Sequence, residues 1–185
     1  MTTRRNILRT IVLAFALVSC DATVESEYSR LRAFLRVTPV TAATPLFEAA
    51  NNPGIFCKIT QDGAHYFFTR QNGTSTQLDI TAVGANYARM QSIYNQGFIV
   101  GTPSQTDINT GQFYQVAFDI VCPNCYKNSI AKMLTLQGEE AVCPRCGRTY
   151  SLANKGIVIK GEKGRKLHRY RMAYVPTQDM FVINN

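Results

Sequence analysis

Four cysteines form two C-x2-C pairs, a spacing that proteins use to hold a metal ion. Cys122 and Cys125 form the first pair, and Cys143 and Cys146 form the second. Each pair can bend the backbone tightly enough for both thiolates to face one ion. The segment between the pairs is long enough to fold back and bring them together. The sequence therefore predicts one metal site with four thiolate ligands.

The alternative use of these cysteines is a disulfide within each pair. A ring closed by a C-x2-C disulfide is strained and usually redox-active, and two such rings would brace little of the fold. Four thiolates around one ion fill a tetrahedron and leave no open position for water or substrate. A closed metal site explains the residues better, and it indicates a structural rather than a catalytic role.

The N-terminal residues have the composition of an export signal. Three arginines precede or enter an apolar run over residues 11–18, which is too short to span a bilayer. The run ends in Leu-Val-Ser-Cys, which resembles the lipobox of bacterial lipoproteins and would make Cys20 the lipidated first residue of the mature chain. We expect a lipoprotein signal peptide over residues 1–19, and a lipidated cysteine with a tether over residues 20–28. An unmodified Cys20 beside an ordinary cleavage site is the alternative.

A lipid on Cys20 would hold the domain at a membrane of the bacterial cell envelope, either facing the periplasm or at the outer membrane. Arg4 and Arg5 also resemble part of a twin-arginine export motif, which carries folded proteins. Paired arginines are common in ordinary secretory signals as well. The export route therefore stays open.

The charge of the chain is unevenly distributed. Its 185 residues, 45% of them hydrophobic, suit one packed domain with at most a small addition. The net charge is +8, and removal of residues 1–19 lowers it to about +5. Much of the excess lies between Lys155 and Arg171, where Glu162 is the one acidic residue. In an exported lipoprotein this predicts a solvated face, with anionic lipid or an acidic partner as the second interpretation and no nucleic-acid partner.

Short strand-like segments at regular intervals, with Gly-rich turns between them, predict an all-β sandwich or barrel. The alternation over residues 31–37 predicts a strand, residues 45–52 predict a short helix, and residues 82–94 predict a loop with a short helix. Cys57 is expected to be buried, and His65 to be structural. Further strands are expected over residues 55–59, 64–70, 74–80, 98–101, 112–121, 131–136, 141–142, 157–160, 167–174 and 180–183.

The cysteine pairs and the segments around them resemble the Rieske-type iron-sulfur domain. A strand, a first ligand loop, a second ligand loop and a β-rich segment follow one another in that family's order, over about residues 113–182. Residues 143–150 stand where the family has its second ligand loop, with Gly147 at the turn and Tyr150 at the aromatic position. The downstream positions that match the family's spacing are Gly156, Val158, Gly161, Leu167 and Tyr170.

The resemblance implies a Rieske-like β domain over residues 29–185, with a metal-binding subdomain at about residues 121–151. Each half of that subdomain is a knuckle of the kind found in zinc ribbons and rubredoxins. A Rieske centre uses two cysteines and two histidines, but Cys125 and Cys146 occupy the histidine positions here. A cluster with mixed ligands is therefore not expected. Gly147 and Tyr150 are expected to lie beside the ligands.

Zinc, a single iron atom and a two-iron two-sulfur cluster all suit four thiolates. We expect zinc, because a protein exported unfolded takes its metal outside the cytoplasm and zinc needs no assembly machinery. The first hypothesis is thus a non-enzymatic envelope lipoprotein with structural zinc. The alternative is an electron carrier that holds iron and serves a periplasmic partner. An independent enzyme is not expected, because we find no paired carboxylates, no nucleophile beside a base and no phosphate loop.

Overall fold

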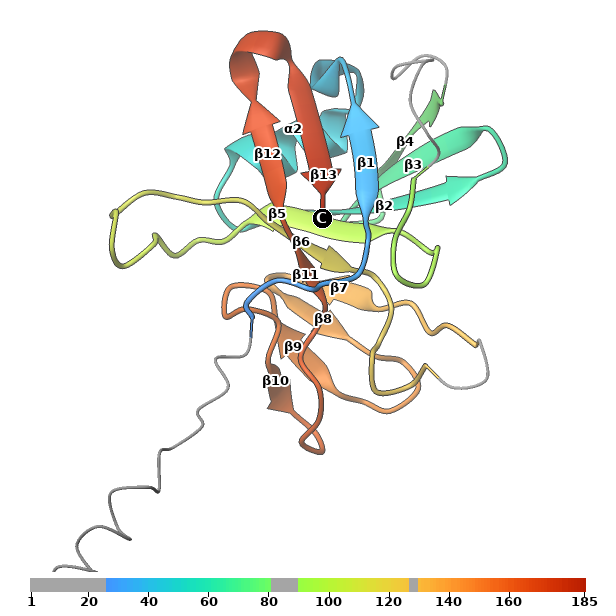
Figure 1. Ribbon diagram of the computed structural model, residues 1–185, viewed down its shortest axis with the longest axis vertical. Coiled ribbons are helices and arrows are strands. Elements are labelled where there is room, and N and C mark those ends of the chain that lie inside the picture. The colour runs from blue at the N-terminus through green and yellow to red at the C-terminus, as the bar shows by residue number, and fades with distance from the viewer. Residues whose placement is uncertain (1–25, 81–89, 127–129) are drawn as a thin grey trace, which may run out of the picture.

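The computed structural model describes residues 26–80, 90–126 and 130–185. These residues form three antiparallel sheets and little helix (Figure 1), so the expected β-rich class is confirmed. The expected signal peptide, Cys20 and most of the expected loop over residues 82–94 lie outside the described residues.

A six-stranded sheet forms the middle of the fold. Within it, the strand Phe98–Thr102 pairs over five residues with the strand Ile55–Asp62, which in turn forms a hairpin with the strand His65–Arg70. Gly63 at the hairpin turn has a φ of +57°, a conformation that glycine adopts without strain. In spatial order the strands are β11 (Arg169–Tyr170), β6 (Val116–Asp119), β5 (Phe98–Thr102), β2 (Ile55–Asp62), β3 (His65–Arg70) and β4 (Ser75–Asp79).

A three-stranded sheet joins the two ends of the described chain. Its strands, in spatial order, are β1 (Phe34–Val37), β13 (Met180–Asn184) and β12 (Met172–Val175). Leu35 and Val37 are fully buried, as the alternation predicts, but Leu31 lies outside the strand and is 53% exposed. The strand begins later than expected because its partner β13 ends at Asn184, which pairs with Phe34.

The first hydrophobic core lies between this three-stranded sheet, the helix α2 (Thr44–Asn51) and one face of the six-stranded sheet. Leu46 of α2 and Phe181 of β13 are fully buried in it. The 3-10 helices η1 (Val40–Ala42) and η2 (Pro176–Gln178) are the other helical elements of the described chain. Cys57 is fully buried in the same core, as expected.

A four-stranded sheet covers the opposite face of the six-stranded sheet through a second core. Phe98 and Val100 of β5 enter the first core, and Ile99 between them enters the second. The middle sheet is therefore buried on both faces along β5. The four strands, in spatial order, are β10 (Val158–Lys160), β9 (Thr149–Ser151), β8 (Glu140–Val142) and β7 (Thr135–Gln137).

Several expected strands are shorter than the sequence pattern predicts. Residues 112–115 precede β6 without joining it, and β7 begins only at Thr135. The expected strand over residues 167–174 is interrupted at Arg171, because β11 pairs with β6 whereas β12 pairs with β13. The chain thus passes there from one sheet to another, which an apolar pattern alone does not reveal.

Candidate metal centre

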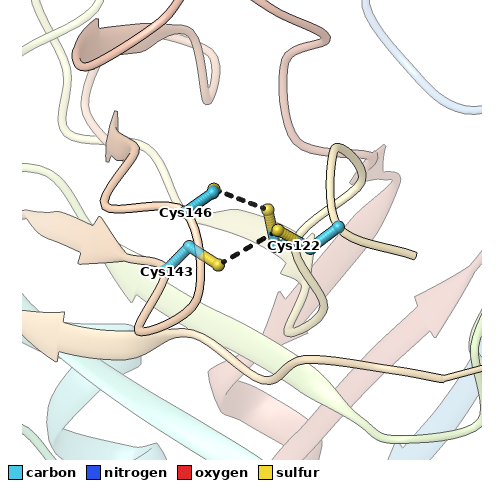
Figure 2. Close-up of side chains that lie close together, drawn as sticks. Cys122, Cys143 and Cys146 are labelled. Carbon is cyan, nitrogen blue, oxygen red and sulfur yellow. Dashed lines mark hydrogen bonds between the residues drawn. The ribbon is translucent and has the colours of Figure 1, made fainter. Parts of the chain in front are cut away.

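The structure brings the four predicted cysteines together. Their Sγ atoms all lie within 4.8 Å of one another, and the two loops that carry them face each other (Figure 2). The Sγ atoms of Cys122 and Cys146 are 3.9 Å apart, and those of Cys125 and Cys143 are 3.7 Å apart. A tetrahedral zinc ion with Zn–S bonds of about 2.3 Å separates its sulfur ligands by about 3.8 Å. The donor atoms therefore fit one tetrahedral ion.

The cysteine pairs do not form disulfides in this structure. Cys122, Cys125, Cys143 and Cys146 are all free thiols. The sulfur–sulfur separations of 3.7 and 3.9 Å join cysteines of different loops. A disulfide within a C-x2-C pair would instead join two cysteines of one loop at a bond length of about 2.05 Å.

The first ligand loop follows directly from β6. The backbone N–H of Cys122 donates to the carbonyl of Lys132 at 2.9 Å, and a bridge between Val121 and Met133 continues this pairing. The N–H of Cys125 donates to the carbonyl of Cys122 at 3.2 Å, which closes the turn. The segment that leads into β7 therefore holds the start of this loop in place.

The second ligand loop is the turn between β8 and β9. The N–H of Cys143 donates to the carbonyl of Arg148 at 2.9 Å, and the N–H of Gly147 donates to the carbonyl of Cys143 at 3.0 Å. Gly147 has a φ of +69°, a backbone conformation that residues with a Cβ atom rarely adopt. The turn that places Cys143 and Cys146 on one side thus explains the glycine at this position.

Tyr150 contacts the site directly. Its side chain is fully buried, and its hydroxyl lies 3.1 Å from the Sγ of Cys122. The same hydroxyl accepts a hydrogen bond from Nδ2 of Asn124 at 2.9 Å, so its own hydrogen is available to the sulfur. Burial, together with the neighbouring Cys122, raises the pKa of Tyr150 and keeps the hydroxyl protonated. Tyr150 therefore orients and stabilises a thiolate at Cys122.

A third loop, which the sequence pattern did not indicate, closes over the first ligand loop. The Asn124 side chain donates to the carbonyl of Arg165 at 2.8 Å and accepts from the N–H of Arg165 at 2.9 Å. A Cβ at Gly164 would lie 2.5 Å from Oδ1 of Asn124, so a larger residue there would disturb this contact. The guanidinium of Arg165 also donates to the carbonyl of Pro123.

Arg148 ties the second ligand loop to the same third loop. Its side chain is 11% exposed, and it binds the carboxylate of Glu162 at 2.5 Å and the carbonyl of Glu162 at 2.8 Å. Burial alone would raise the pKa of the Cys146 thiol, but hydrogen bonds from the backbone and side chain of Arg148, together with those to the Cys125 and Cys143 thiols, lower it below its usual value. Four thiolates around a divalent ion carry a net charge of minus two, which Arg148 partly offsets.

The two histidines take no part in the cysteine cluster. Nε2 of His168 lies 3.2 Å from the hydroxyl of Tyr94, whose ring packs on Tyr126 with centroids 4.2 Å apart. Burial and the charge of Arg165 lower the pKa of His168. His65 lies on β3 with its Nδ1 2.7 Å from Asp79 of β4, a carboxylate that sheet pairing brings close although the sequence places it far away.

No protein-family model, curated protein or solved structure matches the chain. In the described part of the chain, we find no helix that is both long and apolar enough to cross a membrane. The arrangement of the four cysteines is therefore the main guide to function.

Proposed function

We propose that the chain is an exported bacterial lipoprotein, anchored to an envelope membrane through Cys20, with a β domain that one structural zinc ion braces. The observation that carries the metal assignment is the mutual proximity of the four Sγ atoms, all within 4.8 Å. Zinc, when bound by Cys122, Cys125, Cys143 and Cys146, supplies a cross-link between two loops that are far apart in sequence.

The surroundings of the cysteines favour a structural role. Cys122, Cys125 and Cys143 are buried, and Cys146 is half-buried. Four protein ligands leave no coordination position for a substrate. Backbone hydrogen bonds fix both loops, and the third loop buttresses them through Asn124. A rigid, closed set of ligands suits an ion that stabilises the fold.

The spacing of the thiols favours a single ion over a two-iron cluster. A two-iron core places two irons and two sulfides between its pairs of thiolates, so ligands of different irons lie far apart. Six sulfur–sulfur separations of at most 4.8 Å leave room for one central atom instead. Among single ions, zinc is favoured by export, since it is acquired outside the cytoplasm without assembly machinery.

We also propose that the domain is Rieske-like, with cysteines replacing the two histidines. Supporting this, Gly147 and Tyr150 lie beside the ligands at the positions that the resemblance indicates. Gly156 and Gly161 both have positive φ angles and lie against Leu167 and Arg148 respectively. The glycines in the downstream pattern thus have packing roles around the site.

An iron-bearing electron carrier is the second candidate. It is favoured by the partial exposure of Cys146, which would let an electron leave the site at the surface. Two exposed apolar side chains that a redox partner could contact follow the first cysteine pair in sequence, Ile130 at 54% and Met133 at 47% exposure. Rubredoxin-type ligation by the same four cysteines would supply the redox couple.

Elemental analysis with a visible spectrum of the purified mature protein tests both candidates. We expect a colourless protein with about one zinc per chain, and a lower melting temperature after treatment with a strong chelator. Visible absorption that bleaches with dithionite, together with iron in place of zinc, would favour the electron carrier. Mass spectrometry of the N-terminal peptide tests the lipid on Cys20 separately.

A further inference from the structure

The first described residues lie against the segment that leads into β11 and bound an open pocket of about 470 Å³ there. The N–H of Ser29 donates to the carbonyl of Arg169 at 2.7 Å, and Nδ2 of Asn185 donates to the carbonyl of Leu31 at 2.8 Å. The guanidinium of Arg171 lies over the ring of Tyr28, 5.1 Å from its centroid. Residues 26–31 are therefore fixed to the folded domain.

Basic side chains dominate the lining of this pocket. Arg30, Arg165, Lys166 and Arg169 line it, and among the described residues of its lining Glu27 alone is acidic. Glu27 is engaged by Arg169 inside the pocket and by Lys155 at 3.8 Å. The pocket consequently has a surplus of positive charge.

The same surface sits at the start of the tether to the proposed anchor. Five residues lie between Cys20 and Ser26, so the chain spans six steps from one to the other, and at about 3.5 Å per extended step it reaches at most about 20 Å. Leu31 stands beside the pocket with 53% of its surface exposed, between two exposed arginines. A basic surface with a protruding apolar side chain is thus held within reach of lipid headgroups.

We propose that this surface binds the headgroups of anionic phospholipids and so orients the domain on its membrane. The inference rests on the lipid anchor of the proposed function. Arginine and lysine supply charge-assisted hydrogen bonds to phosphate oxygens, and the anionic leaflet attracts basic residues within a Debye length. An acidic protein carries the same negative charge as these headgroups and could also bind the basic surface. The short tether, however, keeps lipid at a far higher local concentration than any soluble partner.

Hydrogen exchange of the purified lipidated protein tests the proposal. The protein is reconstituted into vesicles of phosphatidylcholine, with or without phosphatidylglycerol, so that the lipid anchor is the same in both. We expect peptides covering residues 26–31 and 165–171 to exchange more slowly in the anionic vesicles. High salt should remove the difference, because it screens surface charge.

A double variant, Arg30→Gln with Lys166→Gln, sharpens the test. Each basic residue near an anionic surface strengthens binding by roughly fivefold, so the variant should lose about 25-fold and exchange nearly as in neutral vesicles. The matched control, Lys58→Gln with Lys160→Gln, removes two charges on β2 and β10 outside the pocket lining and should keep the full effect. Circular dichroism of every preparation reports whether each variant is folded.

The possible failures are distinguishable. Equal exchange in the two kinds of vesicle would overturn the headgroup surface and leave the anchor standing. A mass spectrum without lipid on Cys20 would overturn the anchor and this inference together. Slower exchange with an acidic polyglutamate peptide, but not with phosphatidylglycerol, would assign the surface to an acidic protein instead.

Discussion

Replacement of Tyr150 by phenylalanine isolates the contribution of one hydroxyl to metal binding. The hydroxyl lies 3.1 Å from the Sγ of Cys122, and phenylalanine keeps the ring that fills the second core. Asn124 loses one acceptor in the variant, but its amide still donates to the carbonyl of Arg165. The main loss is therefore the hydrogen bond to the thiolate.

The expected size of the effect follows from the burial of this contact. A hydrogen bond to a charged group contributes about 1.5–3 kcal/mol, and Tyr150 is fully buried, so water does not replace its hydroxyl. Loss of a group that contacts a metal ligand typically lowers affinity by about 10–100-fold, or about 1.4–2.8 kcal/mol. We therefore expect Tyr150→Phe to bind zinc about 10–100-fold more weakly than the wild type.

Competition against a chromophoric zinc chelator measures this affinity. Tyr170→Phe is the matched control, because Tyr170 is 1% exposed and its hydroxyl donates to the Asp119 carboxylate at 2.7 Å rather than to a cysteine. The control should lose stability but keep its zinc affinity. An affinity of Tyr150→Phe equal to that of the wild type, or an equal loss in both variants, would refute the assigned role of the hydroxyl.

Three further predictions concern the ion, a buried carboxyl and a tight contact. Cys143→Ser should lose zinc and increase hydrogen exchange in β7–β10, while the first core stays protected from exchange. Unchanged exchange in β7–β10 would contradict an ion that braces this sheet. Burial raises the pKa of Asp119 to about 6, against about 3.9 when unfolded, so the protonated folded form is favoured at pH 5 and the wild type should lose about 1 kcal/mol of stability from pH 5 to 7. Chemical denaturation of Asp119→Asn should show no such decrease in the free energy of unfolding between pH 5 and 7. An equal pH dependence of stability in the wild type and the variant would contradict the assignment to Asp119. Gly97→Ala places a Cβ 2.0 Å from the carbonyl oxygen of Ile59, whereas the Cβ of Gly138→Ala meets no atom within 4 Å. Gly97→Ala should therefore lower the melting temperature far more than Gly138→Ala does.

The sequence was most informative where a local pattern has one physical solution. Two C-x2-C pairs allow few arrangements besides a shared ion or disulfides, so the proximity of their thiols could be expected from the spacing alone. The alternation that ends at Val37 likewise predicted which side chains of β1 are buried, since successive residues of a strand point to opposite faces.

The sequence was least informative where partners come from distant segments. Nothing in the spacing links Asn124 to Arg165 or Arg148 to Glu162, because such contacts depend on how loops cross in space. The division of one apolar segment into β11 and β12 is also invisible locally, since each half pairs with a different sheet.

The sequence by itself thus determined the β-rich class and the four candidate ligands. Both follow from local periodicity and from the chemistry of thiolates. The tertiary structure alone decided that the four sulfurs surround a space suited to one ion, that the Tyr150 hydroxyl faces Cys122, and that a basic pocket lies between residues 26–31 and 165–169. These depend on packing between segments far apart in the chain, and only the folded arrangement of the sheets brings such segments together.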